Sequence, residues 1–271
     1  MFSWLKNKLI NVALNTMSTE EKLCRMFLKT KPKHVRKVVI YTIADYFLKK
    51  FSQHFQNNAS YKKKGIVING TINNVNVSVV KGKMGAPNAA VLMEMFQRIG
   101  VESVFRIDVC GTISEGLPIG SLFVPKDAIS GEGTSRCYAD AHDMDIDFNE
   151  PFPSDQKFLQ VAKQLAKEKF NLQMGTIWTT DGLFCETPKM TAKWAKMGAK
   201  AVDMETSTVY LLGNLFKIRT IAILAVVDRP NSEHDFIRSN KLHQNASQSM
   251  GNLFEFTIND LPQFLHTKKK M

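Results

Sequence analysis

Four short stretches of this 271-residue chain combine apolar runs with side chains that could do chemistry. Each is followed or interrupted by a charged residue or a glycine turn: Arg106 in FRIDVCGTISEG, Asp203 and Glu205 in AVDMETS, Asp228 in AVVDRPN, and Gly85 in KGKMGAPNAA. Charged groups beside buried strands are costly unless they are paired or used. These stretches are therefore the candidate functional residues.

Arg106 and Gly85 are candidates for holding an anion. A guanidinium inside an apolar strand serves either as the partner of a buried acid or as an anion clamp, and the residues alone leave both open. Gly85, with Pro87, makes a tight turn into a helix, and a helix N-terminus can bind an anion. The alternative is that Gly85 and Pro87 form an ordinary turn between a strand and a helix.

The three acids, Asp203, Glu205 and Asp228, suggest a site that binds a sugar and transfers a proton. Strand alternation puts Asp203 and Glu205 on one face, where two carboxylates suit paired sugar hydroxyls or a cation. An acidic helix start is the alternative. Asp228 ends the most apolar run, TIAILAVVD, where desolvation raises a carboxyl pKa and lets it carry a proton. A turn aspartate is the alternative. Together with one arginine, these acids describe a site for a sugar that carries a leaving group.

The elements that must position these residues alternate between strands and helices. Runs such as KVVIYTIA and VESVFRIDVCG predict strands, and DYFLKKFSQHF and MGAPNAAVLMEMFQRIG predict helices, the second ended by Gly100. Asn73-Asn74 predicts a hairpin turn. The pattern predicts one α/β domain with a central mixed, mostly parallel twisted sheet flanked by helices. Ligands bind beyond the carboxyl ends of strands in such sheets.

Three boundaries are more specific expectations. Residues 131–156 are polar and are expected to form a long loop of the kind that tends to be functional. Ser154 is the candidate N-cap of the helix that follows. The last helix is expected at about 239–258.

The positive charge is concentrated at the N-terminal end. Residues 1–64 hold 14 Lys and Arg against 3 Asp and Glu, which accounts for the whole net charge of +11. We predict a basic N-terminal extension at 1–36 before a domain at 37–271, with a solvated basic face rather than a nucleic-acid site. Four scattered cysteines indicate neither a disulfide framework nor a metal site, so the cytoplasm is expected. No apolar run is long enough to span a membrane.

The whole pattern resembles the nucleoside phosphorylase family of bacterial-type purine nucleoside and uridine phosphorylases. The resemblance runs from about Lys37 to Ile258 through KMGAPNAAVLMEMF, FRIDVCGTISEGLPIGSLFVPKDAI, GEGTSRCYAD, TTDGLFCETPKMTAKWAKMGAKAVDMETSTVYLLG and AVVDRPN. It implies that inorganic phosphate, as co-substrate, attacks C1′ of a nucleoside and the base leaves. No metal or other cofactor is implied. It also implies a homo-oligomer, a dimer or a hexamer of dimers.

The resemblance assigns expected roles to particular residues. Phosphate would be bound by Arg106, Gly85 and Lys63, the last donated by a neighbouring subunit. Ribose would be held by Glu205, Met204 and Met84. The base pocket would be lined by Cys110, Gly111, Leu183, Phe184, Val202, Asp203 and Asp228. Asp228 would protonate a departing purine, assisted by Lys241 or Arg238.

The chain departs from the family at the phosphate half of this site. The family's first strand normally ends in Gly-Asp-Pro followed closely by Arg, and this loop cradles phosphate. Here Ile43 and Ala44 stand at the Gly-Asp position and Phe47 at the Arg position. Val109 replaces a Ser or Thr whose hydroxyl binds phosphate, and Asp108 replaces a glycine. Each lost donor weakens phosphate binding.

Three functions therefore remain open from the sequence. The first is a phosphorylase, with purine favoured over uridine because of Asp228 and because CETPKM lacks the Gln and Arg that grip a pyrimidine. The second is a nucleosidase that uses water, with Asp203 or Asp108 as the base. The third is a non-catalytic homologue that binds nucleosides or partners.

Overall fold

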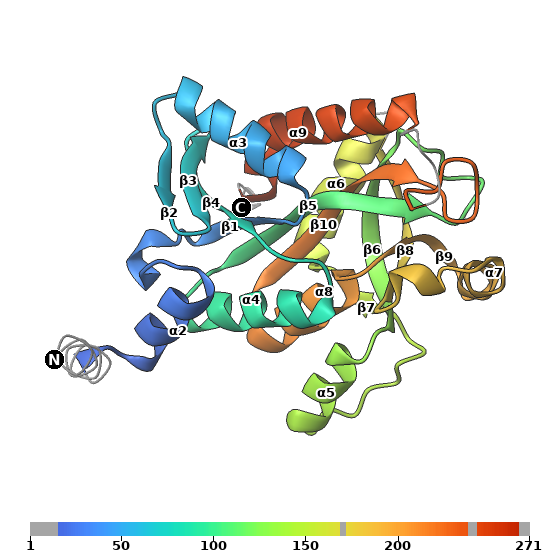
Figure 1. The fold of residues 1–271 in the computed structure, drawn as a ribbon, viewed down its shortest axis with the longest axis horizontal. Coiled ribbons are helices and arrows are strands. Elements are labelled where there is room, and N and C mark those ends of the chain that lie inside the picture. Colours follow the sequence, from blue (N-terminus) through green and yellow to red (C-terminus); the bar gives the residue numbers. More distant parts are fainter. Residues whose placement is uncertain (1–15, 169–171, 238–242, 266–271) are drawn as a thin grey trace, which may run out of the picture.

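The predicted alternation of strands and helices folds into a central sheet with helices on both faces (Figure 1). The structure, a computed structural model, describes residues 16–168, 172–237 and 243–265. Within these ranges, none of the helices is both long and apolar enough to cross a bilayer.

The sheet is mixed, as predicted, and part of it closes on itself. Its strands are β1 (Val38–Thr42), β2 (Lys62–Lys64), β3 (Val67–Ile72), β4 (Val75–Lys81), β5 (Ser103–Thr112), β6 (Leu122–Gly131), β7 (Phe152–Pro153), β8 (Leu172–Thr180), β9 (Ala199–Asp203) and β10 (Arg219–Asp228). They follow the order β10-β6-β8-β9-β5-β1-β4-β3-β2, and an additional β10–β5 pairing closes β5, β10, β6, β8 and β9 into a ring. Strand β5 therefore pairs with three strands, parallel to β1 and β10 and antiparallel to β9.

Two groups of helices cover the sheet. One face carries α2 (Thr19–Phe27), α4 (Ala86–Arg98) and α8 (Thr206–Phe216), and the other carries α3 (Asp45–Asn57), α6 (Gln156–Glu168) and α9 (Gln244–Leu265). Successive β1 side chains enter opposite clusters, Val39 and Tyr41 on the first face and Ile40 on the second. Alternation of this kind, with both faces covered, explains why such strands read as unbroken apolar runs.

The hairpin and the helix end are confirmed. Asn73 and Asn74 adopt φ of 44° and 68° between β3 and β4, and Gly100 has φ of 74° just after α4. Both positions need the left-handed conformation that these residue types tolerate.

Three boundary expectations are wrong. Residues 131–156 are not one long loop, because α5 (Thr134–Ala141) lies within them. Asp155 rather than Ser154 caps α6, since its Oδ1 accepts the Phe158 amide at 2.9 Å while the Ser154 hydroxyl donates to the Lys126 carbonyl. The last helix begins later and runs further than 239–258. Short apolar faces and neighbouring capping residues limit such boundary predictions.

The described part of the N-terminal extension packs onto the domain. Cys24 and Leu28 are fully buried in the same cluster as α4, and the Ile66 amide donates to the Leu28 carbonyl at 3.1 Å. Residues 16–36 are thus continuous with the domain core. Residues 1–15 of the extension lie outside the described residues.

Candidate active site

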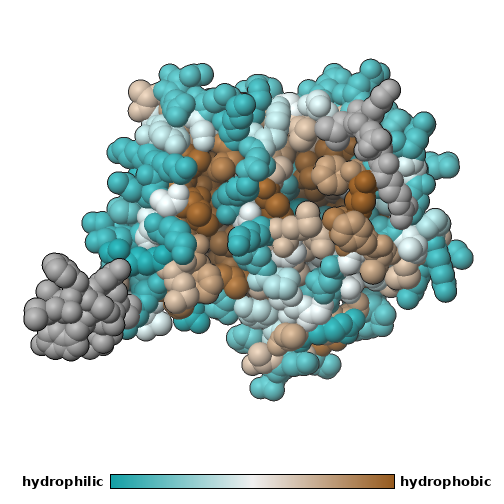
Figure 2. All heavy atoms as spheres, viewed as in Figure 1, coloured by the Kyte–Doolittle hydropathy of each residue, from teal (hydrophilic) through white to brown (hydrophobic). Residues whose placement is uncertain are grey.

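The carboxyl ends of β1, β5, β9 and β10 meet at one edge of the ring, beside the first turns of α4 and α8. A mostly apolar cavity of about 330 Å³ opens there. Figure 2 shows apolar side chains gathered on this face below α9, in the region where the ends of β5 and β10 lie in Figure 1. Arg106, Asp108, Asp203, Glu205, Glu186 and Asp228 supply its charged lining. Mostly apolar cavities with a few convergent polar groups are typical of small-molecule sites.

Arg106 is surrounded by acids rather than open to a ligand. Its side chain is 2% exposed, and its Nη1 lies 2.8 Å from Asp203 Oδ2 while Nη2 lies 2.6 Å from Glu205 Oε2. Asp108 Oδ2 is 3.9 Å from Nη2. Burial alone lowers the pKa of Arg106, but these three carboxylates outweigh it and raise the pKa above its ordinary value. The guanidinium therefore stays charged and is already paired.

Glu205 connects Arg106 to the start of α4. Its Oε1 accepts the Gly85 amide at 2.6 Å, and Gly85 adopts φ of 104°, which favours glycine. Burial raises the pKa of Glu205 to about 7, against the opposing charge of Arg106. The helix start that could hold an anion thus holds a carboxylate from the protein itself.

Both carboxylate oxygens of Asp203 accept hydrogen bonds. Its Oδ1 accepts the Thr179 hydroxyl at 2.8 Å, and its Oδ2 accepts the Thr206 amide at 3.1 Å, the Thr206 hydroxyl and Arg106. A carboxylate has about four lone-pair positions. Asp203 is therefore saturated and serves to orient Arg106 and the start of α8.

Asp108 fills the turn that follows β1. Its Oδ2 accepts the Ile43 amide at 2.7 Å, and its Oδ1 accepts the Val109 amide at 3.0 Å. The Ala44 backbone also stabilises the charged carboxylate. Burial nevertheless raises its pKa, against Arg106 and these amides. The backbone amides after the first strand thus already have an anion.

Asp228 and Glu186 form a second acidic group in the cavity lining. Asp228 Oδ2 accepts the Phe236 amide at 3.1 Å, and burial raises the Asp228 pKa to about 6. A Cβ on Gly111 would lie 2.8 Å from Asp228 Oδ1, so only glycine leaves room for this carboxyl. Burial, with the Asp228 and Asp235 charges, raises the pKa of Glu186 to about 8. Glu186 is therefore mostly neutral at pH 7 and can donate a hydrogen bond.

The family model of the phosphorylase superfamily matches residues 37–259. The chain belongs to the phosphorylase superfamily. The purine nucleoside phosphorylase of Brevibacillus brevis is 30% identical over 161 residues, which are 59% of this chain and 66% of that protein. The guanosine phosphorylase of Halorubrum lacusprofundi is 23% identical over 65% of this chain and 68% of that protein. These relatives match at low identity and over about two thirds of their own length.

Solved structures of the superfamily share the fold. The uridine phosphorylase of Vibrio fischeri has a TM-score of 0.73 at 18% identity, covering 92% of this chain and 99% of that one. The AMP nucleosidase of Bacteroides thetaiotaomicron has a TM-score of 0.65 at 22% identity, covering 89% and 97%. At these identities the likeness concerns the fold alone.

Most of the residues predicted from the superfamily resemblance lie around one cavity. The lining includes Arg106, Cys110, Gly111, Leu183, Val202, Asp203, Met204, Glu205, Asp228 and Met84. Gly85 lies next to them, but its amide is bound to Glu205. These predicted residues therefore lie together in the structure, while their individual roles stay predictions.

Other predicted residues are placed differently. Phe184 is 78% exposed and is not part of the described cavity lining, because it sits on the outer side of a short 3₁₀ turn (Leu183–Cys185). Lys63 is exposed on the edge strand β2, so its role at a neighbouring subunit's site stays a prediction. Arg238 and Lys241 lie outside the described residues. Phe47, at the family's arginine position, is fully buried in the core.

The sequence did not single out Glu186, and it named Asp108 only as one of two candidate bases. Glu186 stands in CETPKM, a segment noted above only because it lacks Gln and Arg. Its approach to Asp228, whose charge helps to raise the Glu186 pKa, depends on a loop returning to the end of β10. Asp108 replaces a glycine of the family pattern, and its bond to the Ile43 amide, which the sequence did not indicate, joins positions 65 residues apart. The available signal in the sequence was that Asp108, an acid, replaces a glycine while the loop after the first strand lacks the family's phosphate-binding residues.

Proposed function

We propose that this protein cleaves the N-glycosidic bond of a nucleoside and releases the free base, in nucleoside salvage, with purine nucleosides favoured over uridine. The observation that carries the proposal is the position of Asp228. Its carboxyl ends β10 inside the cavity, and burial raises its pKa to about 6. A carboxylic acid with such a pKa can give its proton to a departing base near neutral pH.

Two groups of charged side chains in the cavity lining suit the two halves of a nucleoside. Glu205 and Arg106 belong to the first group, in which carboxylate lone pairs can accept sugar hydroxyls. Asp228 and Glu186 form the second group, in which two protonatable carboxyls can face base nitrogens and oxygens. Bond breaking would build positive charge on the ribose, and the carboxylates around Arg106 favour it electrostatically.

The attacking group has two candidates. Phosphate, giving ribose 1-phosphate, is supported by membership of the superfamily and by the relatives that are phosphorylases. Water is supported by the Asp108 carboxylate on the backbone amides after β1.

The test is release of free base from purified protein incubated separately with inosine, guanosine, adenosine and uridine, with and without phosphate. Chromatography separates each base from its nucleoside. Release from at least one purine nucleoside supports the proposal. Binding of nucleosides without release from any of them would leave a non-catalytic homologue. Faster cleavage of uridine than of inosine would contradict the purine preference.

A further inference from the structure

Asp108 occupies the place where the resemblance puts phosphate. In the family the loop after the first strand cradles that anion with its backbone. In this chain the corresponding Ile43 amide donates to Asp108 Oδ2 at 2.7 Å. Val109, which replaces a hydroxyl-bearing residue, donates its own amide to Asp108 Oδ1 at 3.0 Å. The carboxylate thus satisfies main-chain donors that would otherwise face an incoming anion.

The electrostatics of this end of the cavity also oppose phosphate. Arg106 is the only cationic side chain among the described residues that line the cavity, and Asp203 and Glu205 pair with it at 2.8 and 2.6 Å. Asp108 is a third acid facing the same guanidinium. A phosphate placed here would meet carboxylates with no unpaired cation to balance them. Like charges at a buried site strongly disfavour that arrangement.

We infer that the Asp108 carboxylate is a built-in replacement for phosphate and acts as the general base that activates water at C1′. This inference rests on the proposed glycosidic cleavage. Asp108 takes a proton from water as the water oxygen bonds to C1′. The C1′–N bond breaks, its electron pair moves to the base nitrogen, and Asp228 supplies a proton to the base. Nucleoside and water become free ribose and free base, and protons return to Asp228 from Asp108 through solvent.

The hydrogen-bond inventory favours Asp108 over Asp203 as this base. Asp203 has all of its lone-pair positions engaged by Arg106, Thr179 and Thr206. Asp108 accepts the Ile43 amide on Oδ2 and the Val109 amide on Oδ1, and it lines the cavity. With the Ala44 backbone as a third partner, about one of the four lone-pair positions of Asp108 is left for water. Burial also raises the pKa of Asp108 toward the range in which a general base is effective.

The first experiment identifies the nucleophile. The purified full-length protein is incubated with inosine in ¹⁸O-water, either without phosphate or with phosphate at roughly 50-fold excess over inosine. This excess would saturate a phosphate site of moderate affinity. We expect equal base release in both, with ¹⁸O in free ribose. Release only with phosphate, giving ribose 1-phosphate, would overturn the inference and leave the proposed function standing. No release under either condition would overturn both.

The second experiment tests Asp108 itself. Asp108→Asn keeps the shape but removes the base, and we expect inosine hydrolysis to fall by about 100-fold or more. Nucleoside affinity, measured by titration calorimetry, should change by less than about threefold. Asp140→Asn, the same change at an exposed aspartate on α5, is the matched control and should retain full activity. Unchanged hydrolysis in Asp108→Asn would contradict the role of the base.

A third experiment measures phosphate binding directly, beside base release. Asp108→Gly combined with Val109→Ser restores the residue types that the family uses. We expect this double variant to bind inorganic phosphate in ³¹P NMR titrations and to gain phosphate-dependent base release, whereas the wild type does neither. Phosphate binding by the wild type as tight as by the double variant would show that Asp108 does not fill the anion site.

Discussion

Glu205 Oε2 lies 2.6 Å from Arg106 Nη2, and both side chains are almost completely buried. The pair joins the middle of β5 to the start of α8. The other oxygen of Glu205, Oε1, accepts the Gly85 amide at the start of α4. A buried charge with several buried partners is destabilising to remove, because the remaining charges lose their compensation. The same contacts therefore link the stability of the fold to the shape of the site.

Removing the Arg106 charge should destabilise the protein strongly. Arg106→Met leaves three buried acids facing an apolar side chain, and we expect a loss of about 3–5 kcal/mol in the free energy of unfolding. Urea denaturation monitored by circular dichroism measures it. Arg98→Met, which breaks an exposed pair with Glu94 on α4, is the control and should cost less than about 1 kcal/mol. Equal losses in the free energy of unfolding for the two variants would mean that the buried charge cluster stabilises the fold no more than an exposed ion pair does.

Asp228 should control the chemical step through its proton. Asp228→Asn should lower kcat for inosine cleavage by about 100- to 10,000-fold, because the amide cannot act as an acid. In the wild type, the acid is lost as the pH rises through the Asp228 pKa of about 6. We therefore expect kcat/KM to fall above that pH, and the fall to be absent from the residual activity of the variant. A variant with more than a third of wild-type activity would contradict this role.

Glu186 should make stability depend on pH. Its folded pKa is raised to about 8 from an ordinary value of 4.5, so the native state holds a proton that the unfolded chain releases. This contribution to stability is complete below about pH 4.5 and is lost as the pH rises through 8. Thermal unfolding between pH 5 and 8.5 should show a smaller decline in Tm for Glu186→Gln than for the wild type. Glu115→Gln, at an exposed acid, should reproduce the wild-type slope.

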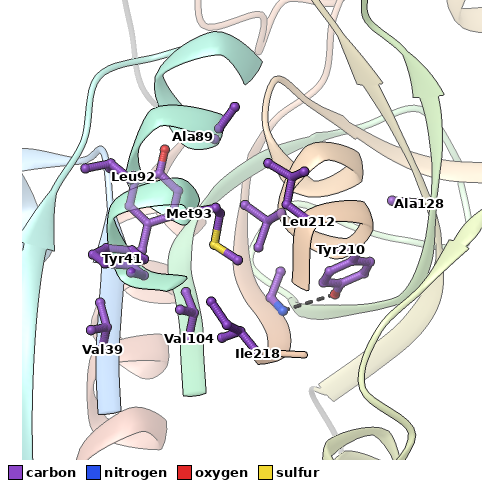
Figure 3. Packing of buried hydrophobic residues seen from close by; sticks show 14 of the residues in the cluster. Val39, Tyr41, Ala89, Leu92, Met93, Val104, Ala128, Tyr210, Leu212 and Ile218 are labelled. Carbon is purple, nitrogen blue, oxygen red and sulfur yellow. Dashed lines mark hydrogen bonds between the residues drawn. The ribbon is translucent and has the colours of Figure 1, made fainter. Parts of the chain in front are cut away.

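Two buried tyrosines should respond differently to loss of the hydroxyl (Figure 3). The Tyr210 hydroxyl donates to the Pro125 carbonyl at 2.7 Å and accepts the Ala222 amide at 3.0 Å, so it ties α8 to β6 and β10. Tyr210→Phe should cost about 1–3 kcal/mol in the free energy of unfolding because it leaves buried backbone groups unpaired. The Tyr41 hydroxyl has no hydrogen-bond partner among the described residues, so Tyr41→Phe should cost little or stabilise. A larger loss for Tyr41→Phe would contradict this difference.

Several parts of the site were predictable because their signals are local. A long run such as TIAILAVVD predicts a buried strand, and Asp228 at its end predicts a residue at the sheet edge where ligands bind. Val202, Met204 and Glu205 are found the same way, because a strand and the helix after it share one short segment. The order and spacing of several such segments also indicate the superfamily, which the family model confirms.

The errors have an equally physical origin. Ser154 and Asp155 are both good helix caps, and only the position of the Lys126 carbonyl decides that the serine bonds elsewhere. Phe184 belongs to a short turn whose outward side no periodicity reveals. The α5 helix is brief and polar, so its pattern resembles a loop. Local composition is ambiguous wherever a tertiary contact selects between two acceptable conformations.

The sequence by itself determined the α/β fold, the superfamily and the strand ends that carry Arg106, Glu205 and Asp228. It also showed that Ile43, Phe47 and Val109 depart from a phosphate site. Only the tertiary structure decided what Arg106 binds, because its partners come from β5, β9 and the start of α8. The structure likewise brought Asp108 to the Ile43 amide through the register of β1 beside β5. Chain patterns specify elements, whereas the pairing of buried charges depends on distances that exist only after those elements have packed.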